Sequence, residues 1–250
     1  MPNIFIMRGV SIGFGSGARL EFDQQGAIKA NFQWHFQYEV APPWLRIALG
    51  HAKEAQEWKE RRVAAWQGTD DNLKASTLEG ECASSMQAIT AAAIAVDALY
   101  ASVQPLIILP PMLVDTWRKK RTPRQAQVSE VIRRAFSLGS ANGAIVKQNV
   151  SQIFALRDLA VHPSAHMKPA VLHPELNIGL EWRFEAFRAH NACLLVLAAG
   201  NLFWQLVHRT RPKNKKVQNY AENMKVFLAE IFPEGEPTIT NSMRREQPGG

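Results

Sequence analysis

The stretch that decides the fold is ANGAIVKQNVSQIFALRDLAVH, residues 141–162. Its apolar residues recur in steps of three and four, so Val146, Val150 and Ile153 share one face of a predicted helix. Arg157 continues the same stripe. Because a guanidinium keeps its charge in proteins, this position requires polar partners or a water-lined groove. The alternative is an arginine whose stem covers the core while its head reaches solvent.

The helix is expected to end at His162, because a residue that precedes proline is disfavoured in the α region. On an ideal helix His162 would lie about 140° round from Arg157. Leaving helical geometry before Pro163 frees the imidazole to turn toward the groove of Arg157. The alternative role is that of a C-terminal histidine favoured by the helix dipole.

The surrounding sequence has the same helical period from residue 42 onward. The predicted helices are 43–67, 72–108, 124–137, 141–162, 180–208 and 214–231, with loops at 137–143 and 162–179. The two long apolar helices, 72–108 and 180–208, need partners over most of their surface. Together with 141–162 they predict a helical bundle. Both contain polar residues, which favours core helices over membrane spans.

The first 40 residues have a different pattern. Residues 27–40, AIKANFQWHFQYEV, alternate apolar and polar side chains, which is typical of a half-buried strand. Shorter strands are expected at 10–14 and 18–22, the second joined to 27–40 through the turn DQQG. We therefore expect a mainly α chain with a small antiparallel β unit at 1–41, a bundle at 42–235 and a flexible tail at 236–250.

The helix 72–108 contains a thin polar stripe of Thr90, Asp97 and Gln104. Asp97 is the only acid in its stretch, AAAIAVDALYASV, and is expected to pair with Arg157 if this stripe faces it. The alternative is a structural salt bridge or a solvated edge.

An arginine with a polar follower and a histidine at the end of a bundle helix resembles the HEPN superfamily. The matching residues here are Arg157, Asp158 and His162, and the resemblance covers roughly residues 72–208. The spacing also occurs at Arg46…His51 and Arg183…His190, but only Arg157 has a polar follower, an apolar helix before it and a proline after it.

The resemblance implies a metal-independent endoribonuclease, often a toxin or antiviral-defence effector, that acts as a homodimer. In such a site His162 would move a proton, Arg157 would stabilise charge on phosphorus, and Asp158 would orient one of them. No cofactor is implied. An antitoxin or a sensor protein is expected as a partner. Some members of the superfamily are not catalytic, so the other interpretation is a helical RNA-binding or protein-interaction module.

Charge also favours an anionic partner such as RNA, since the formal net charge is +7. Two basic clusters stand out, and their members are Arg118, Lys119, Lys120 and Arg121 in the first and Lys213, Lys215 and Lys216 in the second. They are expected either to follow an RNA backbone or to form a solvated surface.

The sequence offers little support for a metal site or a secreted protein. His162, His166 and His173 lie in one proline-broken loop without a convincing third-ligand pattern, so no metal site is predicted. Cys82 and Cys193 are far apart and are expected to be buried free thiols, which favours a cytoplasmic protein. The N-terminus does not have the pattern of a signal peptide.

Overall fold

The structure is a computed structural model, and it describes residues 7–14, 19–22, 28–31, 34–162 and 167–237. The chain divides into two compact units, residues 1–40 and 41–250, and each is described by itself. The mainly α fold with a small antiparallel β unit is confirmed.

The N-terminal unit contains two antiparallel strand pairs. β1 (Val10–Phe14) pairs with β4 (Trp34–Tyr38), and β2 (Arg19–Phe22) pairs with β3 (Ile28–Asn31). The strand predicted over 27–40 is therefore two strands, with residues 32–33 between them outside the described part. Ile12 lies opposite Phe36 in the first pair, and both side chains are exposed, although the alternation predicted a covered face.

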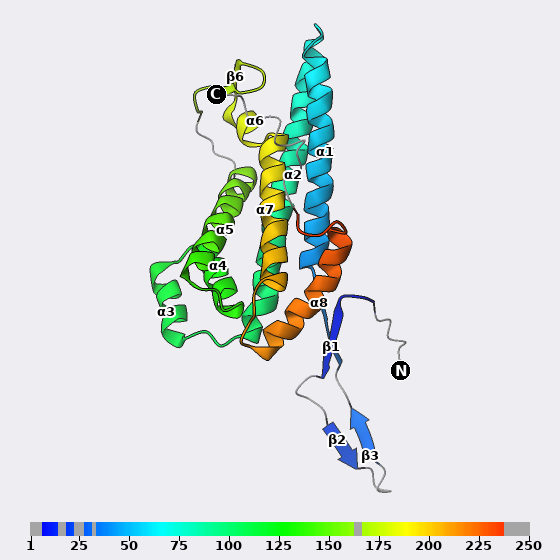
Figure 1. Cartoon of the computed structure of the whole chain (residues 1–250), viewed down its shortest axis with the longest axis vertical. Helices are drawn as coiled ribbons and strands as arrows, with labels where there is room; N and C mark the ends of the chain where they lie inside the picture. The colour runs from blue at the N-terminus through cyan, green and yellow to red at the C-terminus, as the bar shows by residue number, and fades with distance from the viewer. Residues whose placement is uncertain (1–6, 15–18, 23–27, 32–33, 163–166, 238–250) are drawn as a thin grey trace. The chain divides into compact units, whose positions relative to one another are not determined.

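The second unit is built around a long hairpin of α1 (Ala41–Ala65) and α2 (Asp71–Val103). Asp70 caps α2 by accepting hydrogen bonds from the backbone N–H groups of Asn72 and Leu73. The middle of α2 is rich in alanine, and Ala88, Ala92 and Ala95 are fully buried. Small side chains let α1, α5 (Ser140–Val161) and α7 (Ala189–His208) approach α2 closely, as Figure 1 shows.

By length and composition alone, two helical segments, Asp71–Leu106 and Ala189–His208, are apolar enough to cross a membrane. Just over half of each apolar window, 56%, is buried inside the fold. Core helices of soluble proteins have the same character, so this is weak support for a membrane span.

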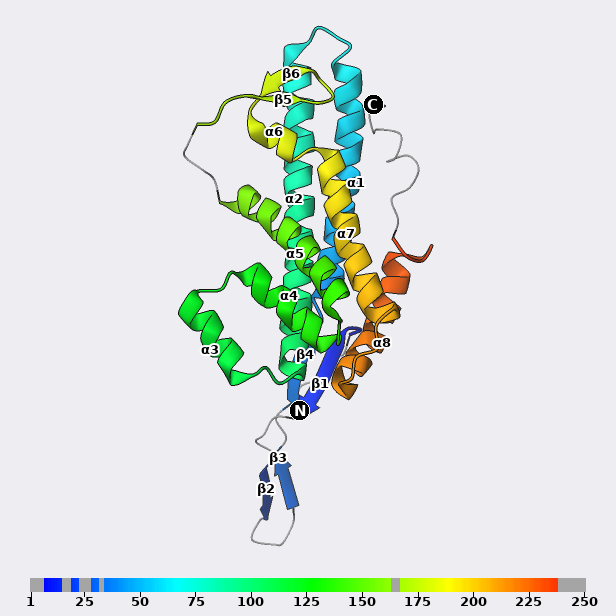
Figure 2. The ribbon, with the colours of Figure 1, turned by 60° about the vertical axis from the view of Figure 1, so that its left-hand side comes forward.

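The segment after α2 contains a helix that the sequence did not predict. α2 continues into the short 3-10 helix η1 (Gln104–Leu106), and α3 (Pro111–Lys120) follows the two prolines at 110 and 111. Proline is well suited to the first position of a helix, which explains the start of α3. α3 buries none of its residues and stands to one side of the bundle helices in Figure 2. α4 (Arg124–Ala135) then returns to the core.

The helix predicted over 180–208 is two helices, α6 (Trp182–Ala186) and α7. Before them, the short strands β5 (Val171–His173) and β6 (Ile178–Leu180) form a hairpin, all of which except Leu180 lies in the loop predicted over 162–179. Glu181 caps α6 by accepting from the backbone N–H of Arg183. α6 ends with Phe187 as its C-cap residue, and α7 begins at Ala189.

The last described segment packs onto α7. α8 (Lys215–Ile231) is capped by Asn214 and leads to two residues that the sequence assigned to a flexible tail. Glu236 pairs with Arg209, and the carbonyl of Pro237 accepts a hydrogen bond from the side chain of Asn201. Residues 238–250, the rest of the predicted tail, lie outside the described part.

Candidate functional site

The predicted motif lies at the C-terminal end of α5. Val146, Val150, Ile153 and Phe154 are buried and hold the inner face of this helix in the core. Arg157 follows Phe154 by three residues, so its stem starts from the same face. Arg157 therefore lies on the predicted helix and continues its inner face.

The guanidinium of Arg157 is held by two neighbours on α5. It lies over the ring of Phe154, with 4.5 Å from Cζ to the ring centroid. Its Nε donates to Oδ1 of Asp158 at 2.9 Å, and Nη2 donates to the same oxygen. A quarter of the Arg157 side chain remains exposed. The arginine is thus positioned by an aromatic face and a carboxylate while part of it reaches the surface.

Asp97 has a different partner from the expected one. Its Oδ1 accepts a hydrogen bond of 2.7 Å from Nε of Arg124, whose guanidinium lies over the ring of Tyr100. This pair joins α2 to α4 and is partly exposed. Asp97 does not contact Arg157 in the described structure, because the polar stripe of α2 faces α4 at this level.

His162 is the C-cap residue of α5, as the following proline predicts. Its backbone N–H donates to the carbonyl of Asp158 at 2.9 Å, and its φ of −115° and ψ of 87° are no longer helical. That hydrogen bond is the last one of the helix, and the imidazole beyond it is exposed. No hydrogen bond joins Arg157 to His162 in the described part of the chain, so their predicted meeting in one groove stays a prediction.

The surface beside the motif is mixed in character. Leu159 and Val161 are exposed by 38% and 44%, and the carboxylate of Asp158 is partly exposed next to them. Leu159 and Val161 are two residues apart on α5, so they point to opposite sides of this helix end and do not form one continuous patch.

The three histidines considered for a metal site do not share an environment. His162 is exposed, His173 is fully buried in β5, and His166 lies outside the described residues. Among the residues that the structure describes, no three His, Cys, Asp or Glu side chains are grouped as metal ligands would be. The two cysteines are free, Cys193 buried and Cys82 half-buried.

Both predicted basic clusters lie on the surface. Arg118, Lys119 and Lys120 form the last turn of α3, and Arg121 follows in a left-handed conformation with φ of 47°. Lys213, Lys215 and Lys216 are exposed around the start of α8. Trp117, beside the first cluster, packs partly against the core.

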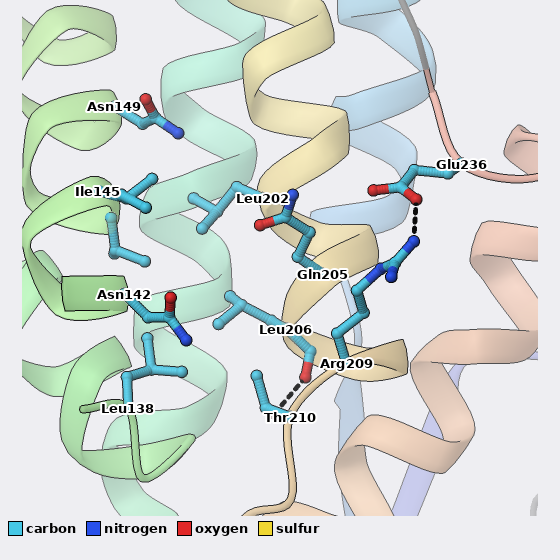
Figure 3. Close-up of a pocket in the computed structure, with 11 residues that line it drawn as sticks. Leu138, Asn142, Ile145, Asn149, Leu202, Gln205, Leu206, Arg209, Thr210 and Glu236 are labelled. Carbon is cyan, nitrogen blue, oxygen red and sulfur yellow. Dashed lines mark hydrogen bonds and ion pairs between the residues drawn. The ribbon is translucent and has the colours of Figure 1, made fainter.

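A pocket of about 280 Å³ lies between the N-terminal half of α5 and the C-terminal half of α7 (Figure 3). Five aliphatic side chains line it, together with polar side chains that include the amides of Asn142, Asn149 and Gln205. The Arg209–Glu236 ion pair is at its edge. Neither Arg157 nor His162 lines this pocket, although α5 contributes to both places.

A second pocket, of about 390 Å³, is strongly basic, and we call it the α4 pocket. Three cations line it: Arg133 and Arg134 from the last turn of α4, and Lys213 from the segment before α8. The remaining lining includes Ser137, Ile107 and Ile108. Only Lys213 of these residues was predicted to contact RNA, because Arg133 and Arg134 follow the pattern of an ordinary helical surface.

A buried group of charges holds the β5–β6 hairpin to α1 and α2. The side chain of Arg62 on α1 is fully buried and donates to both Glu81 of α2 and Glu175 of the hairpin turn. Burial alone would lower the pKa of Arg62, but the hydrogen bonds and charges of these two carboxylates raise it. Arg188 adds a longer contact to Glu175. This group is structural in character, since it lies at the junction of four elements.

His173 lies in the same place and is fully buried. Burial lowers its pKa to about 4, and the positive charges of Arg62 and Arg188 act in the same direction while Glu175 opposes them. Its Nδ1 accepts a hydrogen bond from the backbone N–H of Glu175 at 3.3 Å. The imidazole is therefore neutral at physiological pH.

No protein-family model, curated protein or solved structure matches this chain.

Proposed function

We propose that this chain is a metal-independent endoribonuclease of the HEPN type, with its site at the C-terminal end of α5. The observation that supports it is the state of the motif arginine, which is held by Asp158 and Phe154 and remains partly exposed. An arginine fixed in this way can present its outer nitrogen to an anion without first ordering its side chain. The exposed His162 lies one turn further along, where the helix ends.

The residue types suit cleavage of RNA without a metal ion. The ribose 2′-hydroxyl attacks the adjacent phosphorus, the bond from phosphorus to the 5′-oxygen of the next nucleotide breaks, and a 2′,3′-cyclic phosphate forms. His162 moves the proton of the 2′-hydroxyl toward the leaving 5′-oxygen, the part of a general acid–base residue. Arg157 stabilises the extra negative charge on the phosphoryl oxygens through charge-assisted hydrogen bonds. Asp158 keeps the guanidinium in position.

The proposed active form is a homodimer. One arginine and one histidine form a sparse site, and pairing two copies of the α5 end would double it. Val161, one turn after Arg157 on the same side of α5, is exposed and supplies apolar surface for such a contact. A toxin or defence effector in the cytoplasm, restrained by an antitoxin or a sensor protein, is the setting that this activity fits.

A non-catalytic RNA-binding or protein-interaction module is the second candidate. The observation that favours it is the engagement of Arg157 by Asp158, which neutralises part of its charge before any ligand arrives. In that case the motif would stabilise the end of α5, and the basic clusters would bind RNA without cleaving it.

The test is degradation of RNA by the purified full chain in the presence of EDTA. Arg157→Ala and His162→Ala should each lower the cleavage rate by about 10²-fold or more, since each removes a group that acts in the transition state. Arg46→Ala and His51→Ala are matched controls, because these residues have the same spacing on α1 and should leave the rate unchanged. Cleavage that survives in both motif variants would refute the proposal, and RNA binding without cleavage would favour the module.

A further inference from the structure

We propose that the α4 pocket, formed by Arg133, Arg134, Ser137 and Lys213, is a binding site for a phosphate group. The pocket is separate from the motif residues at the other end of α5, and nothing in the endoribonuclease proposal requires it. It brings together cations that are far apart in the sequence, since Lys213 lies 79 residues after Arg134. A pocket with this charge favours an anion over a neutral ligand.

Two of the cations are already fixed in position. Glu130, one turn earlier on α4, accepts hydrogen bonds from Nε and Nη2 of Arg133 and from Nε of Arg134. These hydrogen bonds, that with Arg133 first, keep the pKa of Glu130 below its usual range, so the carboxylate stays charged. With one carboxylate against three cations, the local charge remains positive.

The same hydrogen bonds leave the outer ends of both guanidiniums available. Within the described residues, Nη1 of Arg133 and both terminal nitrogens of Arg134 have no hydrogen-bond partner. Nitrogens of this kind bind phosphate oxygens in pairs, in the geometry that a guanidinium fork provides. Glu130 therefore has the part of a positioning residue.

Glycine at position 143 makes room for the stem of Arg133 against α5. A Cβ atom at Gly143 would lie 2.8 Å from Cδ of Arg133, which is too close for an unstrained contact. The middle of the Arg133 stem therefore lies against α5 and its head is hydrogen-bonded to Glu130, so little rotamer entropy is lost when it binds a ligand.

Ser137 joins the third cation to the other two. It has a left-handed backbone with φ of 55°, and its Oγ accepts a hydrogen bond of 3.2 Å from the backbone N–H of Lys213. This contact holds the Lys213 segment against the end of α4. The hydroxyl proton of Ser137 is still available to donate to an anion.

The phosphate could belong to RNA or to a small phosphorylated molecule. With a volume of about 390 Å³ the pocket has room for more than the phosphate itself. Ser140, two residues after the pocket residue Leu138, and Arg157 are 17 residues apart on α5, or about 25 Å along the helix axis. An extended RNA strand of a few nucleotides would reach from the pocket to Arg157. A small phosphorylated molecule would occupy the pocket without reaching Arg157.

The experiment is a calorimetric titration of the full chain with inorganic phosphate and, separately, with a short single-stranded RNA. Arg134→Gln and Lys213→Gln each remove one cation whose side chain is not in the core. Each should weaken phosphate binding by about tenfold, the usual effect of losing one charge-assisted hydrogen bond. Lys53→Gln, an exposed lysine of α1, is the matched control and should change binding by less than about twofold.

The RNA titration identifies the source of the phosphate. If the two variants weaken the binding of both phosphate and RNA, the pocket is assigned to the RNA backbone. If they weaken the binding of phosphate alone, it is assigned to a small phosphorylated molecule. Phosphate binding that the pocket variants affect no more than Lys53→Gln does would overturn the proposal. Arg157 does not line the α4 pocket, so the tenfold weakening by Arg134→Gln and Lys213→Gln should also appear in an Arg157→Ala background, whether or not the nuclease proposal fails.

Discussion

The replacement Arg62→Met should destabilise the bundle more than the loss of any surface ion pair. Arg62 has no exposed side-chain surface, and Glu81 has only 2%. Removing the arginine leaves Glu81 buried with a single remaining hydrogen bond, from the backbone N–H of Ala189. Breaking a buried pair in this way costs about 3–5 kcal/mol. For a unit of this size that corresponds to a fall in Tm of roughly 6–20 °C.

The assay is thermal and urea unfolding followed by circular dichroism. Arg124→Gln is the matched control, because it breaks an ion pair with Asp97 whose side chains are 40% and 37% exposed. Exposed pairs contribute about 1 kcal/mol or less, so this variant should unfold close to the native chain.

A double variant tests the reason for the loss. Arg62→Met combined with Glu81→Gln removes the unpaired buried charge and keeps an oxygen for the Ala189 N–H. It should therefore be more stable than Arg62→Met alone. Equal stability of Arg62→Met and Arg124→Gln, or a double variant no more stable than Arg62→Met, would refute the reasoning.

Three further predictions concern other described residues. His173 has a folded-state pKa of about 4 against an ordinary 6.5, so between these pH values the unfolded chain binds more protons than the folded chain. The free energy of unfolding should therefore fall by about 3 kcal/mol from this residue as the pH drops from 6.5 to 4. Urea unfolding across that range should show a weaker pH dependence of stability for His173→Leu, and an identical pH dependence would contradict the role given to His173. Gly80→Ala should destabilise the fold by about 1–3 kcal/mol although alanine has the better helix propensity, because the new Cβ would lie 2.5 Å from the Trp58 ring. Gly50→Ala has open space around it and should stabilise the fold. Equal effects of the two variants in thermal unfolding would be inconsistent with the Trp58 contact. Burial raises the pKa of the Cys82 thiol to about 11, so its alkylation at pH 8 should be roughly 100-fold slower than that of an ordinary thiol, and rapid labelling detected by mass spectrometry would exclude this.

The sequence predicts those parts of the fold that local patterns determine. The end of α5 at Val161 follows from the proline at 163, and α2 begins at Asp71, one residue before its predicted start. α1, α4 and α8 lie within two residues of their predicted bounds. These features need only the helical period and the chemistry of helix ends.

The parts that were not predicted depend on contacts between distant residues. The helix break between α6 and α7 depends on a distant residue, because the first backbone N–H of α7, that of Ala189, donates to the carboxylate of Glu81 on α2. The local sequence therefore does not reveal this break. The pairing of Asp97 with Arg124 likewise depends on tertiary packing, which sets the face that α2 turns toward α4. The turn of the β5–β6 hairpin does have a signal in the sequence, because Pro174 and Asn177 lie between two short apolar runs. In the structure Asn177 has the left-handed backbone, with φ of 53°, that asparagine tolerates in turns.

The candidate site was predicted in part. The positions of Arg157 and His162 on α5 follow from the sequence, but the hydrogen bonds from Arg157 to Asp158 depend on rotamers that a pattern does not give. The α4 pocket was not predicted, because Lys213 reaches Arg133 and Arg134 only through the fold.

The position of Glu81 also bears on the order in which the bundle folds. Its two partners lie 19 and 108 residues away in the sequence, in Arg62 and Ala189. The first contact forms within the α1–α2 hairpin, whereas the second requires the start of α7 to return to α2 across the 108 residues between them. Contacts of long sequence separation are costly in loop entropy and form slowly. We therefore expect the α1–α2 hairpin to assemble early and the first turn of α7 to become ordered in the last step of folding.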